Sequence, residues 1–260
     1  MKKYDFSNIT FIIPIRIDST IRLENLLITI GLLNRWRANI LIVHADRYDN
    51  HFITKLVPKK QNIKYVFYED RDYVFFRTHY INVSIIECKT PYVAVWDADV
   101  IVSPQQIQES QKALMHERFD VSYPYDGEFL NVDKILREEF IQSQNIKSLH
   151  AYKDYMKPLY GGIVYGGGFI ISRDKYIASG GENEKFYGWG SEDSERYKRW
   201  SILEYKIHRS AGPMFHLYHP RDLNGKFRSE LQFRLCNYFL SMTANSSKRE
   251  ILKYNEKEDL

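Results

Sequence analysis

Two aspartates separated by one residue, Asp97 and Asp99, directly follow a short apolar stretch at residues 92–96. Carboxylates this close to a phosphate-rich ligand would repel it, so the spacing favours a divalent cation between the carboxylates and a nucleotide diphosphate. Aspartate is also common in turns, and a turn that binds no ligand is the alternative interpretation. Because the preceding residues have the pattern of a buried strand, we favour the metal and nucleotide interpretation.

Two histidines three positions apart, His216 and His219, lie in the apolar segment 213–220. A neutral imidazole is a good ligand for a transition metal such as Mn²⁺ beside carboxylate oxygens. A single histidine here would more often be a polar surface residue. The pair is therefore predicted to join Asp99 in a site for Mn²⁺, with Mg²⁺ as the alternative ion, and whether one or both histidines bind stays open.

The stretch 161–193 is rich in glycine and ends in Gly188-Trp189-Gly190-Ser191-Glu192-Asp193. Glycine lets the backbone approach a ligand closely or act as a hinge. The flat face of Trp189 suits stacking on a sugar ring, and Glu192 and Asp193 can bind hydroxyls and accept a proton. The alternative is a glycine-rich loop that runs into the ordinary acidic first turn of a helix.

Strands and helices alternate in the first part of the chain. We expect buried strands at 10–15, 39–44, 63–68 and 92–96, with helices at 20–36, 50–56 and 76–87 between them. This order predicts an α/β fold whose ligand lies at the carboxyl ends of parallel strands. The polar residues that follow the strands should therefore share one rim: Arg16, Asp18, Asp46 and Asp97.

The remaining elements are predicted in the same way. We expect helices at 104–116, 129–145, 173–179, 191–203 and from 229, and strands at 119–123, within 166–172 and at 207–209. Residues 146–160 are expected to form a loop, and the charged end, 246–260, to be frayed.

Composition excludes several classes of protein. Of 260 residues, 44% are hydrophobic and 27% charged, which is typical of a globular chain and not of a disordered one. A net charge of +4 is far from the concentrated basic surface of a nucleic-acid-binding protein, but suits an anionic substrate or loose contact with an acidic membrane. Two cysteines without zinc spacing, no visible signal peptide and no apolar stretch near the roughly 20 residues of a membrane span favour a cytoplasmic protein, with peripheral contact to the inner face of the membrane as an open possibility.

Taken in order, these motifs resemble a known family. Pro14-Ile15-Arg16, Arg77 with Asn82, and Asp97-Ala98-Asp99 resemble the nucleotide-sugar half of GT-A fold glycosyltransferases. Tyr165 to Ser172, the Gly-Trp-Gly-x-Glu-Asp run and the two histidines resemble the C-terminal half of the β-1,4-galactosyltransferase family and its bacterial relatives. The resemblance implies one GT-A domain with a mostly parallel central sheet. Its Rossmann-like nucleotide-sugar half would span 1–103 and its acceptor and catalytic half 104–228, with a helical tail at 229–260.

The resemblance also implies roles for single residues. Asp193 would be the general base, Asp99 a direct metal ligand and Arg16 a neighbour of the diphosphate. Trp189 would lie on a mobile loop that closes over the donor, and Glu192 would bind acceptor or donor hydroxyls. The other residues expected at the donor site are Pro14, Asp18, Asp46, Arg77, Asn82, Asp97, Val164 and Gly167.

The implied activity is inverting, metal-dependent transfer of a hexose or N-acetylhexosamine from a UDP-sugar to a glycan or lipid-linked glycan in bacterial surface polysaccharide synthesis. Galactose and GalNAc are the favoured sugars: the family implies galactose, and GalNAc is admitted because Val164 stands where most vertebrate members have an aromatic residue that restricts the donor C2 substituent. The alternatives are a retaining GT-A transferase and a non-catalytic sugar-binding protein. A nucleotidyltransferase fits less well, because residues 14–18 lack the glycines of its phosphate loop.

Overall fold

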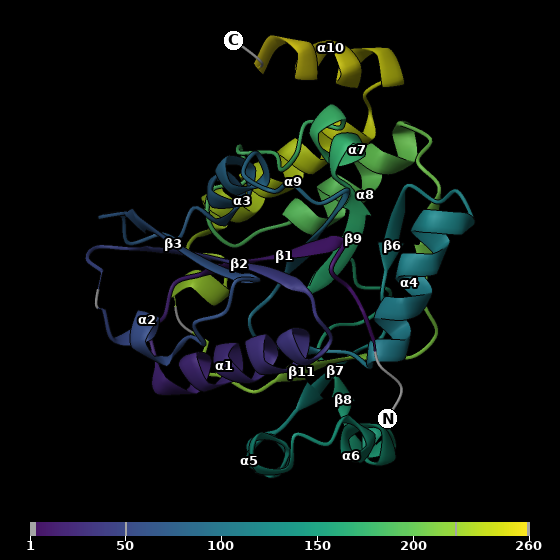
Figure 1. The fold of residues 1–260 in the computed structure, drawn as a ribbon. Coiled ribbons are helices and arrows are strands. Elements are labelled where there is room, and N and C mark those ends of the chain that lie inside the picture. The colour runs from purple at the N-terminus through teal and green to yellow at the C-terminus, as the bar shows by residue number, and fades with distance from the viewer. Residues whose placement is uncertain (1–3, 50, 222, 259–260) are drawn as a thin grey trace.

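The computed structural model of the protein describes residues 4–49, 51–221 and 223–258. A seven-stranded sheet with the order β10-β6-β9-β4-β1-β2-β3 forms its centre (Figure 1). The strands β4, β1, β2 and β3 are mutually parallel, whereas β9 runs antiparallel to β4 and β6. The strand bounds are β1 (Ile9–Ile15), β2 (Asn39–Asp46), β3 (Ile63–Glu69), β4 (Tyr92–Trp96), β6 (Val121–Tyr123), β9 (Gly168–Ser172) and β10 (Ile207–Arg209).

Helices cover both faces of this sheet. In Figure 1, α1 lies below it and α3, α8 and α9 lie above it. All seven residues of β1 are buried, which explains why all of them except Thr10 are apolar. The helix bounds are α1 (Thr20–Arg35), α2 (Phe52–Leu56), α3 (Arg77–Ile85), α4 (Pro104–His116), α7 (Arg173–Ala178), α8 (Glu192–Ile202) and α9 (Glu230–Ala244).

Two serines start helices where the sequence predicts them. The Ser19 hydroxyl accepts a hydrogen bond from the Arg22 backbone N–H at 3.3 Å and caps α1. Ser103 and Gln106 form a reciprocal capping box at the start of α4, with Pro104 in the first turn. These caps fix the residues at which α1 and α4 begin. They therefore also fix where the loops that connect β1 to α1 and β5 to α4 end.

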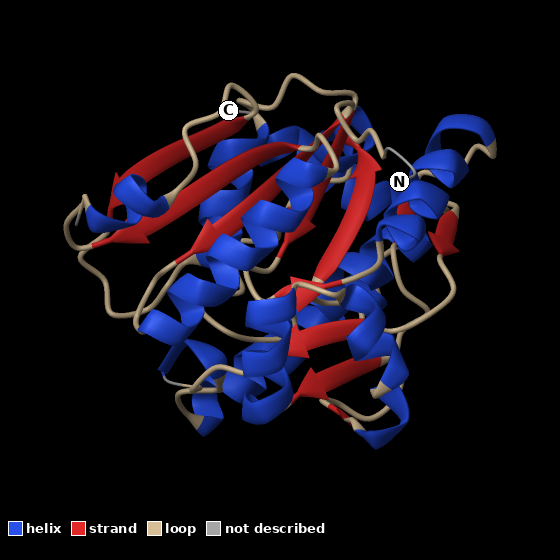
Figure 2. Ribbon diagram, turned by 60° about the horizontal axis from the view of Figure 1, so that its bottom comes forward, coloured by secondary structure: helices blue, strands red, loops and turns tan. Residues whose placement is uncertain are grey.

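A second sheet of four short strands holds the histidine segment, and Figure 2 shows its strands in red with the larger sheet. Its order is β5 (Val100–Ile101), β11 (Met214–Leu217), β7 (Phe129–Val132) and β8 (Lys157–Pro158). β11 runs antiparallel to β5 and parallel to β7. This sheet therefore joins the strand after Asp99 to the strand that carries His216.

The structure corrects three of our predictions. The helix expected over 129–145 is wrong at its start, since β7 precedes α5 (Lys134–Ser143), which Asp133 caps. The expected loop at 146–160 contains α6 (Ile146–Ala151), a 3₁₀ turn (Lys153–Tyr155) and β8. The tail expected to be frayed forms α10 (Lys248–Glu258). Residues 129–132 form a strand because β11 and β8 pair with them, and their partners are distant in sequence.

Three positions covered by our secondary-structure predictions lie outside the described residues. They are position 50, the expected start of the second helix, and positions 259–260 of the tail. Within the described ranges, no helix is both long and apolar enough to cross a bilayer.

Candidate active site

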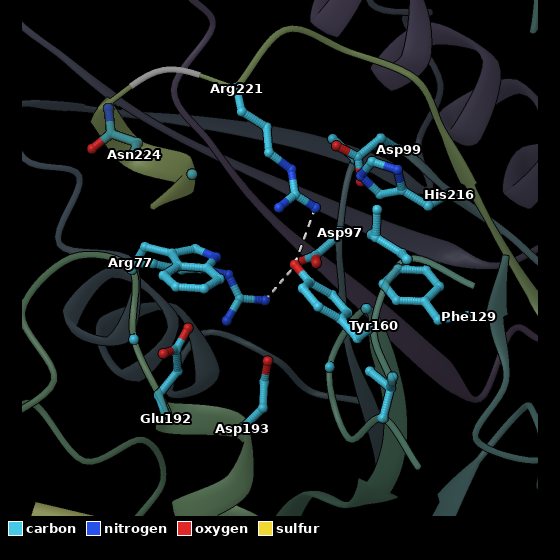
Figure 3. Close-up of a pocket in the computed structure, with 18 of the residues that line it drawn as sticks. Arg77, Asp97, Asp99, Phe129, Tyr160, Glu192, Asp193, His216, Arg221 and Asn224 are labelled. Carbon is cyan, nitrogen blue, oxygen red and sulfur yellow. Dashed lines mark hydrogen bonds and ion pairs between the residues drawn. The ribbon is translucent and has the colours of Figure 1, made fainter. Parts of the chain in front are cut away.

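A pocket of about 430 Å³ opens at the carboxyl ends of β1 and β4. Loop 187–191, the first turn of α8 and the segment after β11 close its other sides. Most residues that the sequence singled out line it: Pro14, Arg16, Asp18, Arg77, Asp97, Asp99, Val164, Gly167, Trp189, Glu192, Asp193, His216 and His219. Figure 3 shows Asp99 and His216 on one side of the pocket and Glu192 and Asp193 on another, with Arg77 and Asp97 between them.

Asp99, His216 and His219 form a compact group of ligand atoms. One carboxylate oxygen and one nitrogen from each imidazole lie within 4.8 Å of one another, and all three residues are buried. The β11–β5 pairing produces this group, because it places His216 opposite Val100, the residue after Asp99. The His219 Nδ1 atom lies 2.8 Å from the Pro220 carbonyl, so Nε2 is the nitrogen on the side of the ligand group, 3.0 Å from Asp99 Oδ2.

The protonation of the histidines also suits a metal. Burial lowers the pKa of His216 to about 4, so its imidazole is neutral at pH 7. Its buried Nδ1 atom has no hydrogen-bond partner. Burial is the largest influence on His219 and lowers its pKa, but the hydrogen bond to Asp99 and the charge of Asp99 together outweigh burial, so the pKa is raised. One carboxylate and two imidazoles, one with an unpaired buried nitrogen, are a fitting set for a divalent transition metal.

Asp97 and Asp99 have different surroundings although one residue separates them. Burial raises the pKa of Asp97 above its ordinary value, even though Arg77 Nη2 lies 2.7 Å from its Oδ1. Burial acts on Asp99 in the same direction, but His216 and His219 together lower its pKa below the ordinary value. Asp99 is therefore the carboxylate that stays ionised beside the histidines, while Asp97 holds the guanidinium of Arg77.

Arg22, Tyr160 and Arg221 are among the pocket residues that went unrecognised in the sequence. Arg22 Nε lies 3.1 Å from Asp18, and Arg221 Nη2 lies 3.1 Å from the Tyr160 hydroxyl. The only sequence signal for Arg221 was its position just after the histidines. Other lining residues that the sequence did not indicate are Phe75, Phe129, Asn224 and Phe227.

Arg16 lines the pocket, but its N–H groups bind the protein. Nε donates to the Ala45 carbonyl at 2.9 Å, Nη1 to the Asp72 carbonyl at 2.8 Å and Nη2 to the Asp70 carboxylate at 2.5 Å. These bonds anchor loop 70–72. Arg16 therefore anchors this loop from the pocket lining, and its place beside a diphosphate stays a prediction.

Two predicted donor residues lie outside the pocket. Asp46 is the last residue of β2, which β1 separates from β4, and its carboxylate accepts a bond from the Arg47 backbone N–H. Asn82 lies five residues after Arg77 in α3, which turns its side chain about 140° away around the helix. Asn82 instead binds Glu182, donating to its carbonyl at 2.9 Å and accepting from its N–H at 2.7 Å.

Glu192 and Asp193 open α8, and both also face the pocket (Figure 3). The two interpretations of this pair are compatible, because the start of a helix favours a negative charge. Burial, together with the charge of Asp193, raises the pKa of Glu192 to about 8, and its buried Oε2 atom has no partner. Asp193 accepts a hydrogen bond from Arg196.

The glycine loop owes its composition to close packing. A β-carbon at Gly166 would overlap the Asp193 carboxylate, so no other residue fits there without displacing it. Gly167 has φ +83°, and a β-carbon there would lie 2.6 Å from Met214 Sδ. The carbonyl of Trp189 accepts a bond from Gln232 Nε2 at 2.9 Å, and its ring contacts Phe227 edge-on at 4.9 Å.

The sequence of this chain is similar to galactosyltransferases. Residues 147–220 match the family described as the N-terminal domain of galactosyltransferase. Beta-1,4-galactosyltransferase 7 of Mus musculus is 26% identical over 185 residues, which cover 68% of this chain and 47% of that protein. The Homo sapiens protein of the same name is 26% identical over 150 residues, 57% of this chain and 36% of that protein. The chain thus spans less than half the length of these relatives.

Solved structures share the fold. A Drosophila β1,4-galactosyltransferase 7 catalytic domain complexed with xylobiose has a TM-score of 0.50 and 16% identity, covering 85% of this chain and 76% of that one. Glucosyl-3-phosphoglycerate synthase from Mycobacterium tuberculosis, complexed with Mn²⁺, UDP and phosphoglyceric acid, has a TM-score of 0.55 and 13% identity, covering 91% and 78%. The predicted GT-A fold and the resemblance to β-1,4-galactosyltransferases are confirmed.

Proposed function

We propose that this chain is a metal-dependent glycosyltransferase that moves a sugar from a UDP-sugar to a hydroxyl of a glycan acceptor. One observation carries the proposal: a buried metal-ligand group and an ionisable carboxylate on a helix start, Asp193, line the same pocket. The matches to galactosyltransferases support it. So does a mutant of the Drosophila enzyme solved with manganese, UDP-Gal and xylobiose, which has a TM-score of 0.52 and 15% identity over 92% of this chain and 79% of that one.

The side of the pocket where the diphosphate would leave holds the metal-ligand group and the cationic side chain of Arg221. Asp99, His216 and His219 would hold a divalent ion such as Mn²⁺, whose charge offsets the charge that develops on the departing diphosphate. The guanidinium of Arg221 extends into the pocket on this side and is held by Tyr160 (Figure 3). A guanidinium bound to a neutral tyrosine keeps its full charge for a phosphate oxygen.

Asp193 is the residue that we assign to proton transfer. Its carboxylate lies in the pocket lining and away from the metal-ligand group, so an acceptor hydroxyl between them reaches both the base and the sugar C1 (Figure 3). Asp193 takes the hydroxyl proton as the oxygen bonds to C1 and the diphosphate leaves from the opposite face. A single displacement of this kind inverts the anomeric centre.

Glu192 has a different part in the proposed reaction. With a pKa of about 8 it is protonated at pH 7; it lines the pocket, and its buried Oε2 has no hydrogen-bond partner. A neutral carboxyl group both donates and accepts hydrogen bonds, which suits a sugar hydroxyl. We therefore assign Glu192 to the binding of acceptor or donor hydroxyls and leave the proton transfer to Asp193.

The donor sugar is proposed to be galactose or N-acetylgalactosamine. Val164 lines the pocket, and its carbonyl accepts bonds from the Tyr125 hydroxyl at 2.9 Å and from Arg209 at 3.1 Å. The small side chain leaves room that an aromatic residue would fill. We further propose that the acceptor belongs to a bacterial surface polysaccharide and that the enzyme works in the cytoplasm, at the inner face of the membrane. Cell fractionation and analysis of surface glycans in a deletion strain test this setting.

A direct test measures binding first and transfer second. Calorimetry should show UDP binding that depends on Mn²⁺, and a screen of UDP-sugars should show which donor raises the unfolding temperature most. Transfer from that donor to glycan acceptors, followed by NMR, should give the inverted anomer. A retained anomer would remove the single-displacement mechanism, and the absence of metal-dependent UDP binding would remove the proposed function.

A further inference from the structure

Asp193 stands at the end of a chain of buried polar contacts that begins on α3. Asn82 binds the backbone N–H and carbonyl of Glu182. The Glu182 carboxylate accepts two bonds from Arg196 Nη1, at 2.9 Å and 2.7 Å. Arg196 Nη2 in turn donates to Asp193 Oδ1. The proposed reaction uses only the last member of this chain, so the other members need an explanation of their own.

Glu182 and Arg196, in the middle of this series of polar contacts, are held firmly in place. The side chains of Glu182 and Arg196 are each 1% exposed, whereas that of Asp193 is 31% exposed. The Tyr176 hydroxyl donates to Glu182 Oε1 at 2.5 Å. The Arg196 guanidinium lies 4.3 Å from the Phe169 ring centroid. One end of the guanidinium is thus locked in the core, and the other end holds a carboxylate that lines the pocket.

The contacts of the Asp193 carboxylate differ between its two oxygens. Arg196 occupies Oδ1. Oδ2 lies against Gly166, close enough that a β-carbon at that position would overlap it. Because both Asp193 and Gly166 line the pocket, Oδ2 is the oxygen left to accept a proton. The bond from Arg196 therefore selects the orientation of the carboxylate.

We propose that Arg196, fixed by Glu182, is a positioning residue that orients the Asp193 carboxylate and keeps it ionised for proton transfer. This inference rests on the proposed function, since it assigns a task within the same reaction. The buried Glu182 balances the charge of Arg196, which allows a guanidinium to be held in the core. Asn82 and Tyr176 hold Glu182 in turn.

Other charged and titratable groups also face Asp193. Arg77 on α3 and Asp97 after β4 act on it from one side, and Glu192 precedes it on α8. Tyrosines near it are Tyr123, Tyr125 and Tyr160. Because Arg77 remains when Arg196 is removed, the loss of Arg196 should shift the pH dependence of transfer without abolishing transfer.

The test uses variants of the full chain that change the charge beside Asp193 in opposite directions. In the double variant Glu182→Gln with Arg196→Met, both buried charges disappear, so no unpaired charge remains in the core. We expect its kcat to fall about 100-fold, as for a misplaced catalytic group. The acid limb of its pH–rate profile should move up by about one pH unit or more. Glu182→Gln alone removes a negative charge, so its acid limb should move to lower pH.

Arg199→Met is the matched control. Arg199 is also buried on α8 and pairs with Glu195 at 3.1 Å, but it has no contact with Asp193. It should lose stability and keep the wild-type pH profile. Calorimetry with UDP and Mn²⁺ should give wild-type affinity for every variant.

The outcomes separate the two proposals. If the acid limb of the double variant coincides with those of wild type and Arg199→Met, the inference is overturned. If wild-type protein binds UDP and Mn²⁺ but transfers no sugar, the proposed function fails instead. Should the double variant not fold, Arg196→Lys and Glu182→Gln carry the test. Arg196→Lys keeps the charge but cannot span both carboxylates, so we expect a lower kcat and an acid limb near that of wild type.

Discussion

His219 Nε2 lies 3.0 Å from Asp99 Oδ2, although the two residues come from opposite halves of the chain. Together with His216, each of these residues offers one ligand atom, and the three atoms lie within 4.8 Å of one another. A carboxylate hydrogen-bonded to an imidazole needs no metal to be stable at neutral pH. The unpaired Nδ1 of the buried His216 is the observation that favours a metal site here.

Substitution of Asp99 tests the metal site. Asp99→Ala should weaken Mn²⁺-dependent UDP binding by about 100-fold or more, because the only carboxylate of the ligand group is lost. Asp46→Asn is the control, since Asp46 lies outside the pocket and the variant should bind as wild type does. Calorimetry with UDP, with and without Mn²⁺, measures both. Equal affinities for Asp99→Ala and wild type would contradict the site.

Substitution of Asp193 tests the assignment of the base. Asp193→Asn should retain Mn²⁺-dependent UDP binding, because Asp193 is not part of the metal-ligand group. Its transfer rate should fall by about 10²- to 10⁴-fold, the usual contribution of general-base catalysis. Single-turnover measurements give the rate. A variant that transfers sugar at the wild-type rate would show that another group accepts the proton.

The pKa of Glu192 predicts how stability depends on pH. Burial raises this pKa from 4.5 to about 8, so ionisation of Glu192 costs more in the folded protein than in the unfolded chain. Its contribution to stability therefore falls as the pH rises from about 4.5 to about 8, and stays level above that. Glu192→Gln should gain unfolding temperature relative to wild type across this window.

Thermal unfolding between pH 4.5 and 9 measures this difference. Glu230→Gln, whose carboxylate is 75% exposed, is the control and should track wild type at every pH. A Glu192→Gln difference that does not change with pH would mean that Glu192 is ionised throughout.

Substitutions of Arg16 and Arg221 should affect different properties, the stability of the fold and the affinity for UDP. Arg16→Met removes three hydrogen bonds that hold loop 70–72 and should cost about 1–3 kcal/mol of stability. Arg221→Met removes an exposed guanidinium whose one hydrogen bond among the described residues is to Tyr160, so stability should change little. UDP affinity should fall about tenfold in Arg221→Met, the loss of one charge-assisted bond. Denaturant unfolding measures stability and calorimetry measures UDP affinity. If Arg16→Met lost UDP affinity and Arg221→Met lost stability, Arg16 would be the arginine that binds the diphosphate.

Val164 should influence the choice of donor. Val164→Tyr places an aromatic ring in the lining of the pocket and should lower kcat/KM for UDP-GalNAc more than for UDP-Gal. Val164→Leu adds volume without a ring and should change the ratio less. Competition between the two donors measures the ratio directly. If neither variant alters it, Val164 does not contact the C2 substituent.

Much of the fold is predictable because its signals are local. β1, β2 and β4 are built around short, predominantly apolar runs, which is typical of strands buried on both faces. The caps at Ser19 and Ser103 depend on residues only three positions away. The failure at 129–132 has the opposite cause, since those residues extend only because β11 and β8 pair with them. Local periodicity cannot report a partner that is far away in the chain.

The sequence by itself determined the chemical groups of this site, their order and the strand ends that carry them. Asp99, Asp193 and the two histidines were all recognisable from residue type and immediate neighbours. Only the tertiary structure decided which groups meet: that β11 pairs with β5, that Arg16 binds a loop, and that Arg196 holds Asp193. The reason is physical, because strand register and buried ion pairs depend on contacts between segments that the order of the chain does not specify.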